Sequence, residues 1–222
     1  MPEDGELIGG VQFYYPHSIA YHQGALYLTE AGNHALRRLS DGRTTTLIHG
    51  RDKIGNVWGL AFSPFDDGIH VYFTSTQFGL LRFDVGTASL MRLTNEIGSL
   101  GSLSATRLNL PRGVCFVAAD VIAIADYGRQ QIILGNISED SVSIVCNGVR
   151  ETTDGDSQLC RLNYPRSVLL LNHSLFIGET ESIRRIPLDS SVHPLVPTTT
   201  KRGEIRSGCQ MITDCCHLRD CH

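Results

Sequence analysis

The sequence predicts an all-β fold in which one four-stranded antiparallel unit occurs four times. Three observations carry this prediction. A segment that opens on proline, or on valine in one copy, recurs at Pro16, Val57, Pro111 and Pro165. A short apolar segment follows each of these and ends in an acid in three copies, and a third apolar segment comes after a tight turn. Short apolar runs separated by turn residues are typical of β-hairpins.

The first copy shows the unit most clearly. It reads Tyr-Pro-His-Ser-Ile-Ala-Tyr from Tyr15, Ala-Leu-Tyr-Leu-Thr-Glu from Ala25 and Ala-Leu-Arg-Arg-Leu from Ala35. A fourth strand is expected to close each copy, in order at residues 44–48, 89–93, 141–146 and 192–196. The copies then span about 13–50, 55–94, 108–147 and 162–196. Residues 1–12 read as a segment like those between copies, and residues 197–222 as an irregular tail with Cys and His.

Equivalent positions agree across the copies. The second residue after the proline position is always small: Ser18, Gly59, Gly113 and Ser167. The strands are apolar almost throughout, which is expected when both faces of a sheet are buried. A small residue lets backbones approach closely. Four-stranded sheets set radially around an axis meet both conditions, so the pattern predicts a β-propeller whose first strands line the axis.

The second strand ends in an acid at Glu30, Asp126 and Glu179, whereas Ser75 takes this place in the second copy. A carboxylate at the start of a turn can accept hydrogen bonds from the backbone amides of that turn. We therefore expect the three acids to be structural.

Three motifs resemble the NHL repeat. They are Pro-x-Gly/Ser-aliphatic, the run Leu-Tyr-Leu-Thr-Glu-Ala-Gly-Asn-His-x-Leu-Arg-Arg-Leu, and the Asp-Gly pairs at Asp4-Gly5 and Asp154-Gly155. The resemblance covers about residues 11–196 and implies a six-bladed propeller. Since only four copies are present, we expect an incomplete ring from a larger propeller, with a self-contained four-blade ring as the alternative. Open blade edges would allow self-association.

Composition excludes several functions. The hydrophobic fraction of 41% allows a substantial core, and a net charge of −4 without a long basic run argues against nucleic-acid binding. No apolar run approaches the roughly 20 residues of a membrane-spanning helix. The common hydrolase and nucleotide motifs are absent, so no catalytic residue and no cofactor is assigned.

The seven cysteines fall into two groups. Cys115 lies in a predicted inner strand and is expected to be a buried free thiol, while Cys146 and Cys160 flank a loop between copies and could form a disulfide. The tail holds Cys209, Cys215, Cys216 and Cys221 beside His217 and His222, without the paired Cys-x-x-Cys of well-formed zinc sites, so no metal site is assigned. A truncated disulfide-rich module and a disordered end are the two interpretations of this tail.

The compartment is not determined by these residues. The cysteines and the glycosylation sequons at Asn136 and Asn172 favour an extracytoplasmic location if a leader precedes the chain.

The residue directly after each proline position is the candidate binding residue. These residues are His17, Trp58, Arg112 and Arg166. In a propeller they lie near the mouth of the central channel, where ligands commonly bind. A cationic, partly aromatic rim suits a carboxylate, a phosphate or an acidic peptide. Alternatively, the arginines are solvated or pair with Asp126 and Glu179.

Two function classes remain. The NHL resemblance implies a non-enzymatic scaffold that binds a protein or peptide partner through its channel mouth and loops. The alternative is a metal-dependent enzyme or small-ligand binder similar to peptidylglycine amidating lyase or lactonase-like propellers. His17 in Pro-His-Ser-Ile-Ala matches the lyase motif, but Trp58, Arg112 and Arg166 replace its other histidines, and a catalytic zinc needs about three protein ligands.

Overall fold

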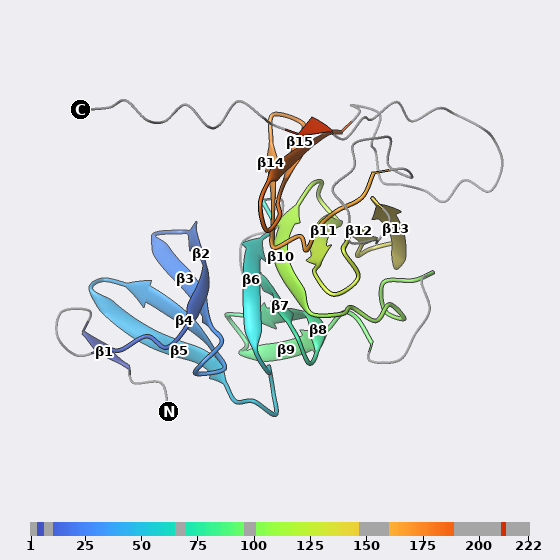
Figure 1. Cartoon of the computed structure of the whole chain (residues 1–222). Coiled ribbons are helices and arrows are strands. Elements are labelled where there is room, and N and C mark those ends of the chain that lie inside the picture. The colour runs from blue at the N-terminus through green and yellow to red at the C-terminus, as the bar shows by residue number, and fades with distance from the viewer. Residues whose placement is uncertain are drawn as a thin grey trace, which may run out of the picture.

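The fold consists of four antiparallel sheets arranged as a four-blade β-propeller (Figure 1). The computed structural model describes residues 4–6, 11–64, 70–95, 101–146, 160–188 and 210–211. Strands account for all regular structure in these residues, and none of them forms a helix. The all-β propeller predicted from the repeats is therefore confirmed.

Each sheet is built from strands that follow one another in sequence and pair with their neighbours. The first sheet contains β2 (Pro16–His22), β3 (Ala25–Glu30), β4 (Ala35–Ser40) and β5 (Arg43–His49). The second contains β6 (Val57–Phe62), β7 (His70–Ser75), β8 (Gly79–Asp84) and β9 (Ser89–Arg92). The third contains β10 (Pro111–Phe116), β11 (Val121–Asp126), β12 (Gln131–Asn136) and β13 (Ser141–Val145). The fourth contains β14 (Ser167–Leu171), β15 (Ser174–Gly178), β16 (Ile183–Pro187) and β17 (Gln210–Met211).

Two strands differ from the expected pattern. β1 (Gly5–Glu6) adds a fifth strand to the first sheet by pairing with β5, and the sequence gives no apolar signal for it. The fourth strand of the fourth sheet is β17, which pairs with β16. The strand expected at 192–196 lies outside the described residues, as do Asp154-Gly155 and the tail cysteines and histidines.

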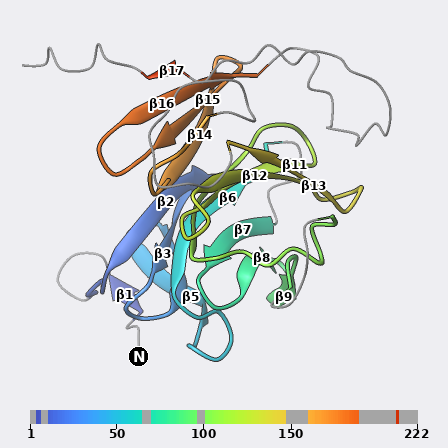
Figure 2. The ribbon, with the colours of Figure 1, turned by 45° about the vertical axis from the view of Figure 1, so that its right-hand side comes forward.

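The inner strands β2, β6, β10 and β14 contact one another in this order, and Figure 2 shows β2, β6 and β14 meeting near the centre of the molecule. The small residues lie at these contacts. A Cβ atom on Gly59 would lie 2.4 Å from the carbonyl oxygen of Arg112, and one on Gly113 would lie 2.6 Å from Cα of Ser167. Such distances leave no room for a side chain, so crowding of the inner backbones explains the glycine in the second and third copies.

Three apolar clusters form the core, one between each pair of consecutive sheets. Leu60 and Phe73 belong to the cluster between the first and second sheets, Ile122 to the next, and Ile177 to the last. Every residue of β11 and β12 is buried, because the third sheet has a neighbour on each face. This is the reason that the strands do not alternate between apolar and polar residues.

Within the part of the chain that the structure describes, no helix is long and apolar enough to cross a membrane.

Candidate functional site at the channel mouth

Two residues from each of the four copies line a common pocket at the mouth of the channel. The pocket has a volume of about 420 Å³ and is lined by two sets of equivalent residues: the large His17, Trp58, Arg112 and Arg166, and the small Ser18, Gly59, Gly113 and Ser167. The structure therefore brings together all four side chains that the sequence singled out.

An irregularity at the start of three inner strands positions His17, Trp58 and Arg112, whereas Arg166 directly precedes β14. The pairing register of β2 with β3 shifts between Pro16 and Ser18, and the register of β10 with β11 shifts between Pro111 and Val114. β6 shows the same shift between Val57 and Leu60. A bulge of this kind bends the strand and redirects a side chain. The residue after the proline position is thereby released from regular pairing.

Trp58 is the centre of the site. The His17 ring stacks on it, with ring centroids 3.7 Å apart and planes inclined by 27°. The guanidinium carbon of Arg112 lies 3.7 Å from the centroid of the Trp58 ring and 4.2 Å from that of Tyr127. Arg166 reaches the same Tyr127 ring at 5.8 Å. Aromatic rings from the second and third sheets therefore hold the guanidiniums of Arg112 and Arg166 in place.

Sequence reasoning missed Tyr127. It directly follows the acid that ends the second strand of its copy, and the corresponding residues of the other copies are small or polar. Its position in the turn after β11 was the available signal. Its ring also contacts Tyr164, with centroids 4.8 Å apart.

The positive charge of the mouth comes from its arginines. Burial, followed by the charge of Arg112, lowers the pKa of His17 from its ordinary value, so its imidazole is neutral at pH 7. Burial also lowers the pKa of Arg112, with Arg166 contributing, but a guanidinium stays charged. Within the described ranges, the buried Arg112 Nε and Trp58 Nε1 have no hydrogen-bond partner. The expected cationic, partly aromatic rim thus carries two donors without an acceptor.

The turn acids do not neutralise these arginines. Each acid instead accepts a hydrogen bond from the backbone N–H two positions before the proline of its own copy: Tyr14 to Glu30 at 2.8 Å, Asn109 to Asp126 at 3.0 Å, and Asn163 to Glu179 at 2.6 Å. The acids therefore fix the segment that leads into each inner strand, which places the mouth residues. The turn's own amides contribute less, as in the 3.4 Å bond from Arg129 N to Asp126.

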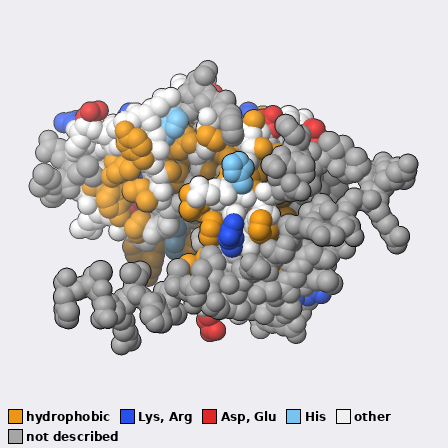
Figure 3. Space-filling model, turned by 90° about the horizontal axis from the view of Figure 1, so that it is seen from above, with side chains coloured by type: hydrophobic (Ala, Val, Ile, Leu, Met, Phe, Trp, Pro, Cys, Tyr) orange, Lys and Arg blue, Asp and Glu red, His pale blue; other side chains and the backbone are white. Residues whose placement is uncertain are grey.

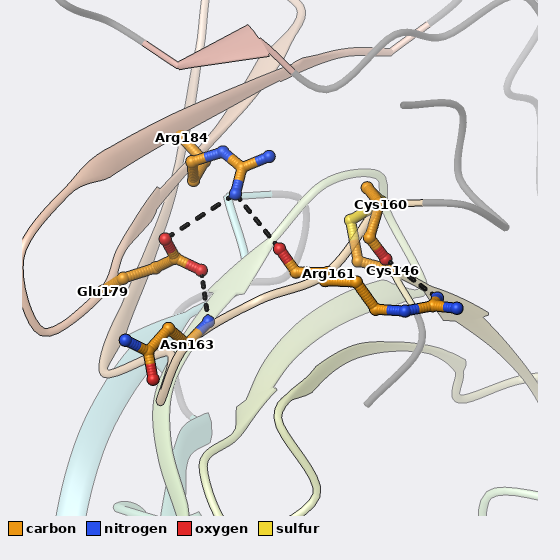
Figure 4. The surroundings of a disulfide bond; sticks show 6 residues. All are labelled: Cys146, Cys160, Arg161, Asn163, Glu179 and Arg184. Atoms are coloured by element: carbon orange, nitrogen blue, oxygen red, sulfur yellow. Dashed lines mark hydrogen bonds and ion pairs between the residues drawn. A yellow bond between two sulfur atoms is a disulfide. The ribbon is translucent and has the colours of Figure 1, made fainter. Parts of the chain in front are cut away.

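Other arginines pair with the acids. Arg37 Nη1 lies 2.9 Å from Glu30 Oε2, and both side chains are fully buried. Arg184 Nη1 lies 3.8 Å from Glu179 Oε2 and donates to the carbonyl of Arg161, as Figure 4 shows. Alternation along a third strand points one arginine of each Arg-Arg pair outwards: Arg38 is half-buried and Arg185 is exposed. The first arginine of each pair is instead a buried partner of the acid.

Hydrogen bonds between sheets also locate the mouth. The hydroxyl of Thr29 donates to the carbonyl oxygen of Trp58, and that of Thr74 donates to the carbonyl oxygen of Arg112 at 2.5 Å. Each threonine thus holds the backbone of a mouth residue in the next sheet. Sequence reasoning missed them, although both occupy the last position but one of their strands.

Cys146 and Cys160 are joined by a disulfide, drawn in Figure 4, and both are fully buried. The bond links the residue after β13 to the segment that enters the fourth sheet. Cys115 is free, and burial raises the pKa of its thiol to about 12.

Of the two sequon asparagines, Asn136 is buried and Asn172 is exposed in a turn. Among the described residues, no three His, Cys, Asp or Glu side chains lie close enough to hold a metal ion.

Comparisons with known proteins support the fold alone. No family model and no curated protein sequence matches the chain. A solved structure of a nidogen/laminin complex is 17% identical at a TM-score of 0.54, covering 81% of this chain and 78% of that chain. An auxiliary nutrient binding protein from Bacteroides thetaiotaomicron is 12% identical at a TM-score of 0.63, and the match covers 85% of this chain and 42% of that chain. Virginiamycin B lyase from Staphylococcus aureus is 17% identical at a TM-score of 0.56, and the match covers 86% of this chain and 57% of that chain.

Proposed function

We propose that this chain is a non-enzymatic propeller of the NHL-repeat type that binds a carboxylate-bearing protein or peptide segment at its channel mouth. The observation that carries the proposal is Arg112. Its guanidinium is held between sheets by the Trp58 and Tyr127 rings, and its buried Nε has no acceptor within the described residues. A buried donor without a partner destabilises the free protein and is compensated when a ligand supplies the acceptor.

A carboxylate fits this site better than a neutral group. Two guanidiniums, those of Arg112 and Arg166, converge on one aromatic ring, and arginine binds carboxylates through two parallel hydrogen bonds. The bulge in β10 and the hydrogen bond from Thr74 fix the backbone of Arg112, and the carbonyl oxygen of Arg166 accepts a hydrogen bond from Gly113 N–H at 2.9 Å. A rigid site of this kind binds without first ordering its own side chains.

The proposal is tested by the fluorescence of Trp58, the single tryptophan of the chain. A Glu-rich peptide is titrated against the protein, with a Gln-substituted peptide of the same length as its control. Arg112→Gln removes one charged hydrogen-bonding group, which contributes about 1.5–3 kcal/mol. Binding of the Glu-rich peptide should then weaken by roughly 10–100-fold.

Arg51→Gln is the matched control variant, since Arg51 is exposed and lies outside the pocket. It should bind the Glu-rich peptide as the unmodified protein does. Equal affinity for the two peptides, or equal weakening by Arg51→Gln and Arg112→Gln, would refute the proposal.

A small-ligand or enzymatic function is the second candidate, because a pocket of about 420 Å³ also has the size of a small-molecule site. Zinc or calcium in stoichiometric amount in the purified protein would favour this candidate. So would a Trp58 fluorescence change with a small dicarboxylate that the Glu-rich peptide does not produce.

We also propose an oxidising compartment for this chain. The buried Cys146–Cys160 disulfide supports this, because structural disulfides persist mainly outside the cytosol. Mass spectrometry of the alkylated native protein tests it: neither cysteine should be alkylated unless reductant is added first.

A further inference from the structure

The first and last sheets of the row each present an apolar face to solvent. On the first sheet the exposed side chains are Ile19, Tyr21 and Leu26, which we call the leading face. On the fourth sheet they are Leu169, Leu171 and Ile183, which we call the trailing face. Figure 3 shows hydrophobic side chains gathered at the surface on the side where Figure 1 places the first sheet.

The leading face has equivalents inside the molecule. Ile19 directly follows the small residue of its inner strand, as do Leu60, Val114 and Val168 in the other copies. Those three residues are 6%, 6% and 7% exposed because each packs against the preceding sheet, whereas Ile19 is 62% exposed. Ile19 therefore belongs to the same type of contact, but no sheet within the described ranges covers it.

The trailing face shows the converse. Leu169 is the next residue along its strand, and its equivalents are Ala20, Ala61 and Cys115. Each of these packs into the cluster shared with the following sheet, but Leu169 is 57% exposed. Every internal contact thus joins the trailing side of one sheet to the leading side of the next. In the described residues, the leading face of the first sheet and the trailing face of the fourth sheet are left uncovered.

We propose that a second copy of this chain covers these faces head to tail, the trailing face of one copy packing on the leading face of the other. The three internal contacts show what covers a face of each kind, and the chain itself carries the complementary surface. The contact is heterologous, joining two different surfaces, so it can extend beyond two copies unless the ring closes. It involves none of the four large mouth residues, so it stands or falls separately from ligand binding.

Two variants each block one half of the contact: Ile19→Glu on the leading face and Leu169→Glu on the trailing face. Both residues are exposed, so the new carboxylate stays in water and leaves the fold intact, which circular dichroism checks. Met91→Glu is the matched control, since Met91 is 49% exposed on β9 and belongs to neither face.

Sedimentation velocity over a wide concentration range gives the readout. The unmodified chain and Met91→Glu should increase in mass with concentration, and each face variant alone should remain a single chain. Mixing the two face variants leaves one intact contact, so the mixture should form a complex of two chains. A mass independent of concentration for the unmodified chain overturns the proposal. So does loss of association in Met91→Glu, association that only one of the two face variants abolishes, or a mixture that does not associate.

Discussion

Replacing Gly59 by alanine tests the crowding of inner strands on which the architecture depends. The added Cβ atom would lie 2.4 Å from the carbonyl oxygen of Arg112 and 3.0 Å from both Gly113 Cα and Val114 N. All three are backbone atoms, so no side chain can rotate away. The two strands must separate by about 1 Å for that oxygen to reach the 3.4 Å of ordinary contact.

The separation has two energetic consequences. Inserting a methyl group into a packed site typically destabilises by about 1–3 kcal/mol. Moving Arg112 also strains the hydrogen bond from Thr74 Oγ1 to its carbonyl oxygen, and a buried hydrogen bond contributes about 1 kcal/mol. We expect a loss of about 3 kcal/mol in the free energy of unfolding, which lowers the Tm of a chain this size by roughly 6–12 °C.

Thermal and urea unfolding measure this loss. The control is Gly101→Ala, because a Cβ atom on Gly101 would meet no atom within 4 Å. That variant should be neutral or more stable by up to about 1 kcal/mol, since alanine restricts the unfolded chain. If Gly59→Ala were as stable as Gly101→Ala, the small residues would not mark close backbone approach at an axis, and the explanation of the repeat would fail.

Three further changes have defined outcomes. Burial raises the pKa of Asp126 to about 6, so its folded form holds a proton more tightly than the unfolded chain and stability falls as pH rises from about 4 to 6. Asp126→Asn keeps an acceptor for Asn109 N–H but cannot titrate. In urea unfolding it should remove this pH dependence, which amounts to about 3 kcal/mol at 1.36 kcal/mol per pKa unit. An unchanged pH profile would contradict this expectation. Replacing both Cys146 and Cys160 by alanine opens a loop with a sequence separation of 14 and should destabilise by about 3 kcal/mol. Reductant should then destabilise only the unmodified protein. Arg37→Met leaves Glu30 buried without its closest cation and should destabilise by about 3–5 kcal/mol in urea unfolding. Adding Glu30→Gln should recover part of that loss, and no recovery would show that the ion pair is not the cause.

The sequence predicted what depends on position within the repeat. Ser18, Gly59, Gly113 and Ser167 occupy the same position in every copy, so alignment of the copies was enough to predict that they meet at an axis. The same holds for the mouth, because His17, Trp58, Arg112 and Arg166 occupy one repeat position. Residues that share a position at the start of the inner strands converge on the axis, whatever their chemical type.

The sequence did not predict the partners that these residues find. Strand alternation predicts that one arginine of each Arg-Arg pair points outwards, but it does not reveal that the inward arginines, Arg37 and Arg184, pair with an acid of their own sheet. The stacking of Arg112 on Tyr127 depends on side-chain direction, which repeat alignment does not give. β17 pairs with β16 from a distance along the chain that no local pattern bridges.

The number of uncovered apolar faces, represented by Ile19 and Leu169, does not depend on how many sheets the row contains. Appending one more sheet to either end would hide one such surface and create another of the same kind. An open row of sheets therefore always has two exposed apolar faces, whether it contains four sheets or five. Adding sheets does not improve its solubility. Only joining the two ends, within one ring or through a second copy, covers both surfaces at once.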